Sequence, residues 1–226
     1  MTMLARIRLL QMTSQAFPIG GYSHSYGLEA AIEGGWVRDE KSVRQWIADV
    51  LMFSVGAYEI PVLCDMGEAW MAQDCIALSR LNAQFLATRE SAELRSATVQ
   101  MGFSMRKLLA ALPNLPEFLQ TALHAMEEPS LPCVWSGAAW AWAVPPSDST
   151  AAYLWSWAEN QVLVAMKSVP IGQTSGQRVL LEIGETIARL AERAVPRDEH
   201  LRSNFAPGLA ILCSQHETQY SRLFRS

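Results

Sequence analysis

The residue pair best suited to bind a metal ion is Cys213 and His216, three positions apart on a predicted helix. This spacing places both side chains on one helix face, where a thiolate and an imidazole could ligate the same ion. Glu217 or His200 could add a further ligand. Two ligands are half of a metal site, so a packed cysteine beside a capping or surface histidine is the commoner arrangement. A site shared across a dimer would supply more ligands.

Ser23 and His24, followed by Glu29, contain the residue types of a hydrolase triad. In a triad the histidine activates the serine, and a carboxylate orients the histidine. Sequence neighbours on a helix do not face one another, however. The chain also has no G-x-S-x-G motif and no predicted strand to carry one. We therefore expect no catalytic use of this pair.

Residues 17–29 form a glycine-rich turn, Phe-Pro-Ile-Gly-Gly-Tyr-Ser-His-Ser-Tyr-Gly-Leu-Glu, which we call the first motif. Pro18 fixes the entry of the chain, and Gly20 and Gly21 can adopt positive φ. A glycine-rich turn that leads into a helix can bind phosphate. This one has no strand before it and does not match G-x-x-x-x-G-K-[ST]. It predicts a structural turn with a helix that faces a partner.

A second Pro/Gly-punctuated segment, residues 167–177, joins two predicted helices and is called the junction. Lys167 stands at the C-terminal end of the first helix, where a cation is favoured. Pro170 and Gly172 break the helix, and the side chain of Gln173 is suited to satisfy the backbone groups that the break exposes. Thr174 and Gln177 are suited to the same task.

The composition indicates that the chain can bury a large apolar core. It gives no sign of a basic surface that would bind nucleic acid. Half of the 226 residues are apolar, and the formal net charge is −4. Its four cysteines are scattered, which fits reduced thiols in a cytoplasm. We find no secretion signal near the start. The most apolar stretch, Leu131 to Val144, is too short to cross a bilayer as a helix, so we expect no membrane span.

Apolar residues recur at three- and four-residue steps, which predicts an all-α single-domain bundle of roughly ten helices over residues 1–226. One stripe runs from Leu94 to Leu112, and another begins at Val43 with Asp39 as its N-cap. A third helix is expected to open at Asp148 or Ser149. The polar segment 195–207 is predicted to be a surface loop.

The last residues, 217–226, form a tail that is unusually rich in the residue types found at protein interfaces. Tyr220, Leu223 and Phe224 stand among Arg222 and Arg225, and aromatic and arginine side chains are enriched at partner interfaces. Chain ends usually consist of small polar residues unless they are tied down. The tail is therefore predicted to dock on a partner.

Three of these segments together resemble the UreF family of urease accessory proteins. The first motif matches the family's "LP(I/V)GG(F/Y)S…GLE" signature, and residues 167–173 match "K-x-V-P-(L/F)-G-Q". Residues 216–226 are similar to the family's ending, "HETQYSRLFRS", and residues 88–95 to its "RE…ELR" helix start. The departures are mild: Phe17 and Ile171 replace the usual residues, and His24 fills a variable position.

The resemblance implies an adaptor with no reaction of its own. UreF-like proteins bridge UreD, also called UreH, and the GTPase UreG, and the assembly inserts nickel into apo-urease. It further implies a homodimer within that complex and no stably bound cofactor, because nickel and GTP are handled by the partners. Glu29 and Lys167 would lie on the surface that meets UreG. Tyr220, Arg222, Leu223 and Phe224 would dock on UreD/UreH or on the second copy.

Two alternatives stay open. The chain could regulate the GTPase directly at UreG's nucleotide site, where a cation such as Lys167 or Arg89 would stabilise phosphoryl-transfer charge. It could instead carry nickel itself, through Cys213 and His216.

Overall fold

The computed structural model describes residues 1–195 and 199–225, and within these ranges it is helical and has no strand. The prediction of an all-α fold is confirmed. Residues 196–198 of the predicted surface loop and Ser226 of the tail lie outside the described residues. The elements, in chain order, are α1 (Met3–Thr13), η1 (Gly21–Ser23), α2 (Leu28–Glu33), α3 (Glu40–Val50), η2 (Leu51–Glu59), α4 (Ile60–Met71), α5 (Cys75–Ala87), α6 (Ala92–Ala111), α7 (Glu117–Ala125), α8 (Leu131–Ala141), α9 (Pro146–Ser168), α10 (Gln173–Glu192), η3 (Glu199–Leu201) and α11 (Pro207–His216).

Short polar side chains define where several of these helices begin. Asp39 forms a capping box with Ser42, whose backbone N–H donates to Asp39 Oδ1 at 2.8 Å. This confirms the predicted cap, and the interaction satisfies amide groups that have no partner within the helix. α9 differs from the prediction because it opens at Pro146, two residues before Asp148. Proline is favoured in the first helical turn, where no N–H partner is needed.

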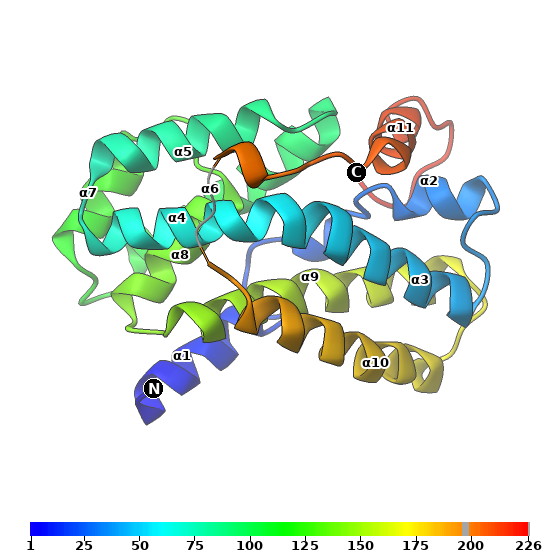
Figure 1. Ribbon diagram of the computed structural model, residues 1–226, viewed down its shortest axis with the longest axis horizontal. Helices are drawn as coiled ribbons and strands as arrows, with labels where there is room; N and C mark the ends of the chain where they lie inside the picture. The colour runs from blue at the N-terminus through cyan, green and yellow to red at the C-terminus, as the bar shows by residue number, and fades with distance from the viewer. Residues whose placement is uncertain (196–198, 226) are drawn as a thin grey trace.

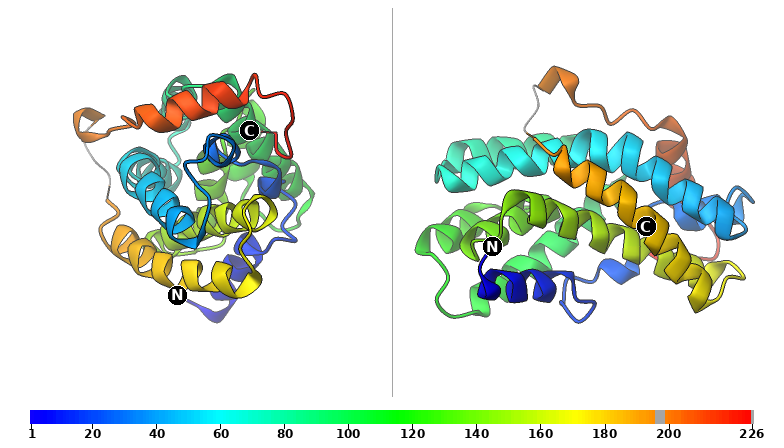
Figure 2. Two further views of the ribbon diagram at one scale, coloured as in Figure 1. Left: turned by 90° about the vertical axis from the view of Figure 1, so that its right-hand side faces the viewer. Right: turned by 60° about the horizontal axis from the view of Figure 1, so that its bottom comes forward.

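The bundle is built around α9, which packs along α10, and around α8, which packs against both α4 and α6 (Figure 1). α1 and α11 lie on opposite faces of the molecule, as both Figure 1 and Figure 2 show. The buried apolar side chains form one connected cluster that runs from Ala5 to Phe224. The core therefore includes a residue of the C-terminal tail.

α3, η2 and α4 follow one another without a break and form a single rod over Glu40–Met71. The middle part, Leu51–Glu59, is π-helical, and the Ile60 N–H donates to the Val55 carbonyl. By length and composition alone this rod could cross a membrane, with a mean hydropathy of 1.6 in its most apolar window. More than half of that window, 56%, is buried inside the bundle, as expected for a central core helix. The sequence prediction had instead named Leu131 to Val144 as the most apolar stretch.

α11 crosses next to α2, at the right-hand end of Figure 1. Gly27, just before α2, permits this approach in two ways. Its φ is +78°, and a Cβ at this position would lie 2.9 Å from Cys213 Sγ of α11. Any other residue would strain the backbone and collide with α11. The contact brings the last helix and the tail onto the first motif.

Candidate partner-binding site

Glu29 is the centre of a buried cluster that joins the first motif to the tail. It lies in the first turn of α2, where a negative charge is favoured, and its side chain is buried. Glu29 Oε1 accepts from the Leu223 backbone N–H at 2.7 Å, and Oε2 accepts from the Phe224 N–H at 3.0 Å. One carboxylate thus satisfies two consecutive backbone amides of the tail.

His216, the last residue of α11, is fully buried and lies between two carboxylates. Its Nε2 is 2.9 Å from Glu29 Oε2, and its Nδ1 is 2.6 Å from Glu93 Oε2. Each ring nitrogen of His216 is thus within hydrogen-bonding distance of a carboxylate oxygen. Arg222 donates to the other oxygen of Glu93 at 2.6 Å. The two carboxylates therefore link α2, α6, α11 and the tail, with Arg222 at the exposed edge of the cluster.

Phe224 is held from two sides. Its ring is buried in the core, and the Lys167 ammonium lies 5.6 Å from the ring centroid. Lys167 is itself an exposed residue in the last turn of α9, as the sequence predicted. The next residue, Arg225, donates its backbone N–H to the Ser23 carbonyl of the first motif at 2.8 Å. Glu29 and Lys167 therefore both contact the same tail residue.

The tail has an inner face and an outer face. Phe224 and the Arg222 guanidinium point to the chain's own structure, whereas Tyr220 is fully exposed and Leu223 is 73% exposed. An exposed tyrosine and leucine held on an ordered backbone cost little entropy to dock. Of the four tail residues predicted to dock on a partner, Tyr220 and Leu223 are thus accessible, Arg222 is 40% exposed but paired with Glu93, and Phe224 is buried.

The expectation that Glu29 lies on a surface that meets a partner needs correction. Its carboxylate is buried, and every acceptor interaction described above is made within the chain. The sequence could not show this, because residues 216–224 reach Glu29 only through the packing of α11 on α2. The helix that was predicted to follow the turn is present as α2, which ends at the Gly34 C-cap.

The first motif is fastened to α9 through backbone carbonyls. Asn160 Nδ2 donates to the His24 carbonyl at 2.8 Å, and Gln161 Nε2 donates to the Ser25 carbonyl at 3.1 Å. Gly20 has φ +75°, so this glycine performs the turn that was predicted for it. Neighbouring Pro18 and Gly21 lie within the same turn before α2. Burial, and secondarily the charge of Arg225, lowers the pKa of His24 to about 4, so the imidazole is neutral near pH 7.

The junction is a tight, exposed connection between α9 and α10. The Val169 N–H donates to the Ala165 carbonyl at 2.8 Å, and Pro170 follows where the helix ends. Gly172 is the N-cap of α10 and Gln173 its first residue, and no side chain caps this helix. The prediction that Gln173 and its polar neighbours satisfy the exposed backbone groups is therefore wrong for the start of α10.

The candidate metal ligands Cys213 and His216 do lie on one helix, but they do not form a metal site. Both ring nitrogens of His216 are engaged by carboxylates. Burial raises the pKa of Cys213 to about 12, so it is a thiol packed beneath Gly27. Within residues 1–195 and 199–225 no group of three or more candidate ligands is gathered for a metal ion.

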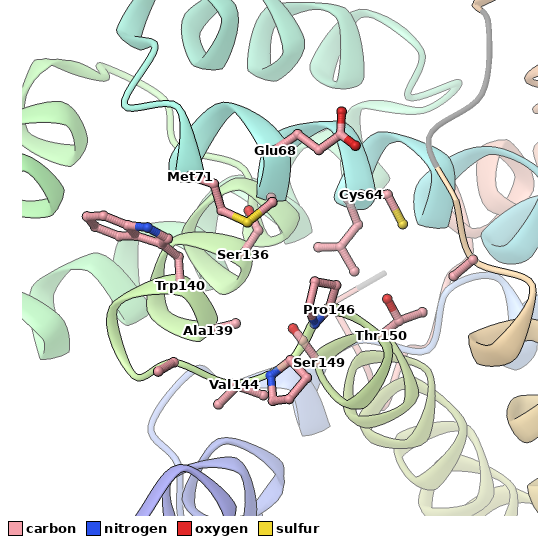
Figure 3. A pocket seen from close by; sticks show the side chains of 15 residues that line it. Cys64, Glu68, Met71, Ser136, Ala139, Trp140, Val144, Pro146, Ser149 and Thr150 are labelled. Atoms are coloured by element: carbon pink, nitrogen blue, oxygen red, sulfur yellow. The ribbon is translucent and has the colours of Figure 1, made fainter. Parts of the chain in front are cut away.

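A hollow of about 320 Å³ lies between α4, α8 and the start of α9 (Figure 3). Its walls are mainly apolar, and its two serine hydroxyls, Ser136 and Ser149, already form hydrogen bonds. Ser136 Oγ donates to the Pro132 carbonyl at 2.8 Å, and Ser149 Oγ accepts from Trp135 Nε1 at 3.2 Å. Burial raises the pKa of Cys64 to about 11, so this thiol is not a nucleophile near pH 7. Among the described residues that line it, no nucleophile is paired with a base.

Comparison with known proteins gives a consistent result. The sequence model of the family UreF matches residues 37–184. A urease accessory protein UreF of Dechloromonas aromatica is 50% identical over 226 residues, which covers 100% of this chain and 99% of that protein. The corresponding protein of Azoarcus sp. strain BH72 is 48% identical and covers 99% and 97%. That of Pseudomonas fluorescens strain SBW25 is 41% identical and covers 96% and 97%. The similarity to the Dechloromonas protein covers the whole chain and therefore includes the first motif and the tail, which lie outside the part matched by the family model.

Proposed function

Because this chain belongs to the UreF family of urease accessory proteins, we propose that it is a non-catalytic adaptor in urease maturation. It bridges UreD/UreH and the GTPase UreG in the cytoplasm, so that nickel is inserted into apo-urease. It acts as a homodimer within that complex. Nickel and GTP are bound by its partners rather than stably by this chain.

The observation that carries this proposal is the way the chain presents its own tail. Glu29 holds the tail backbone from the inside and Glu93 holds the Arg222 side chain, while Tyr220 and Leu223 project outward. Aromatic and large apolar residues on a fixed backbone are typical anchors of protein interfaces. A surface of this kind suits a binding partner, and the described polar clusters offer no substrate-binding arrangement of nucleophile and base.

Co-expression with UreD and UreG, followed by size-exclusion chromatography, tests the adaptor function. We expect one peak that contains all three proteins, with this chain present in two copies. A Tyr220→Ala, Leu223→Ala double variant should elute without UreD while its helical circular dichroism is unchanged. Recovery of neither UreD nor UreG with the unaltered chain would contradict the proposal.

A second function, regulation of UreG's GTPase, is favoured by one observation. Lys167 is exposed at the end of α9, next to the tail, so it can reach a bound partner. The other cation considered for this role, Arg89, cannot act in this way. Its side chain is only 6% exposed and is paired with Glu59 at 2.6 Å. Direct regulation of UreG would therefore depend on Lys167 alone of these two.

A further inference from the structure

A small internal cavity of about 60 Å³ lies where the first motif, η2, α6 and α9 meet. Its wall combines aromatic and apolar side chains with several polar ones, among them Glu59, Arg89, Ser156 and Asn160. The cavity is separate from the cluster around Glu29 and from the apolar hollow of Figure 3. No function discussed above uses it.

Three polar atoms of this wall are buried and lack a hydrogen-bond partner among residues 1–195 and 199–225. They are Arg89 Nε, Ser156 Oγ and Asn160 Oδ1. The side chain of Arg89 is 6% exposed, and Asn160 is 9% exposed. Buried polar groups are nearly always paired, because leaving them unpaired costs free energy. All three residues line one cavity, which points to a bound group that completes the pairing.

The charges of the cavity wall indicate that the bound group is electrically neutral. Glu59 and Arg89 are its charged residues, and they neutralise one another in an ion pair of 2.6 Å. Tyr153 donates its hydroxyl to Glu59 at 3.0 Å, and burial raises the pKa of both Tyr153 and Tyr26 well above the usual value. Both phenols are therefore neutral. An added ion in this cavity would have no counter-charge left to pair with.

The hydrogen-bonding pattern requires a group that both donates and accepts. Arg89 Nε needs an acceptor, whereas Asn160 Oδ1 needs a donor. The orientation of the Asn160 amide is fixed, because its Nδ2 donates to the His24 carbonyl at 2.8 Å. A water molecule needs at least about 10–15 Å³ of cavity volume, so roughly four could be accommodated.

We propose that this cavity is a binding site for a small cluster of ordered water molecules, which link Arg89, Ser156 and Asn160. The cluster hydrates the buried Glu59–Arg89 pair, and it holds the Asn160 amide in the orientation that fastens the first motif to α9. The motif in turn accepts the backbone N–H of Arg225 at the Ser23 carbonyl. The bound water thus supports the segment on which the tail is seated.

A pair of serine variants on α9 tests the proposal in the full-length chain. Ser156 and Ser168 both have a buried Oγ without a partner among the described residues, but only Ser156 lines the cavity. Ser156→Ala removes a partner of the water cluster, and we expect Tm to fall by about 2–4 °C, the shift that a lost hydrogen bond produces in a chain of this size. Ser168→Ala removes an unpaired hydroxyl and should leave Tm unchanged or raise it. Equal or higher stability of Ser156→Ala relative to Ser168→Ala would overturn the proposal.

A high-resolution crystal structure of the same chain provides a direct measurement. We expect water density within hydrogen-bonding distance of both Arg89 Nε and Asn160 Oδ1. Xenon, which enters dry apolar cavities, should not occupy this one under pressure. Xenon density in the cavity, or no water next to those two atoms, would refute the proposal independently of the stability measurements.

Discussion

The backbone N–H of Leu223 donates to Glu29 Oε1 at 2.7 Å, across 194 positions of the sequence. Because the same carboxylate also accepts from Phe224 and contacts His216, the first motif and the tail form one structural unit. Lys167 reaches this unit from the junction, through the ring of Phe224. The three segments that resemble the UreF family therefore meet at a single place. Glu29 and Lys167 can influence a partner through the tail that they both hold.

Replacement of Glu29 by glutamine should release the tail. The amide cannot accept from both backbone N–H groups, and the buried His216 loses one of its two carboxylates. A buried polar group left without its partner typically costs about 1–3 kcal/mol of folding stability. We expect hydrogen exchange of the Leu223 and Phe224 amides to become fast, measured by mass spectrometry.

Glu33→Gln is the matched control for this change, because Glu33 is an exposed residue on the same helix. It should leave both the stability and the exchange rates unchanged. Retained protection of the tail amides in Glu29→Gln would show that the carboxylate does not hold the tail.

Variants on the inner and outer faces of the tail should have different effects, the first on folding stability and the second on partner binding. Phe224→Ala removes a buried aromatic ring, and we expect a loss of about 3 kcal/mol in the free energy of unfolding. Leu223→Ala changes a residue that is 73% exposed and should alter stability by less than about 0.5 kcal/mol. Urea unfolding measures both values.

Leu223→Ala should instead weaken binding to UreD by about tenfold, as expected for an interface anchor. Co-purification and isothermal titration with UreD give this number. Unchanged affinity in Leu223→Ala and Tyr220→Ala would contradict the outward docking role of the tail.

The sequence predicted the helices well because their signals are local. The Asp39 side chain itself caps the start of its helix, and the ring of Pro170 disfavours helix at the residue before it. It did not reveal the π-helical segment Leu51–Glu59, whose composition is that of an ordinary apolar helix. That segment became visible only in the backbone hydrogen bonds.

The cluster at Glu29 could not be found from local signals. Its members come from α2, α6, α11 and the tail, so the contacts depend on how the helices pack. A carboxylate near a helix start looks like an exposed residue in the sequence. The tail's composition did not separate its two faces either, because Leu223 and Phe224 are both apolar, yet Leu223 is exposed and Phe224 is buried. The motifs indicated which segments matter, and packing showed that they touch.

Acid should destabilise the fold partly through His24. Burial lowers its pKa to about 4 in the folded chain, against about 6.5 when unfolded, so the unfolded state binds a proton first. The contribution of His24 to stability is thus complete above pH 6.5 and declines as the pH falls toward 4. The slope approaches about 1.4 kcal/mol per pH unit.

Urea unfolding at pH 7 and pH 5 measures this dependence. His24→Gln should be less stable at pH 7 but should lose less stability on acidification than the unaltered chain. An identical pH slope in the two proteins would show that His24 does not titrate in this range.

Lys167→Ala should change partner activity with little effect on folding. Its ammonium is exposed and lies 5.6 Å from the Phe224 ring, and such a cation–π contact is worth about 0.5–1 kcal/mol. If Lys167 acts on UreG, GTP turnover by UreG within the complex should differ clearly between the variant and the unaltered chain. Lys107→Ala, which changes another exposed lysine, on α6, is the control and should have no effect. Equal GTP turnover with Lys167→Ala and with the unaltered chain would rule out the hypothesis that Lys167 regulates UreG directly. The proposed adaptor function would stand.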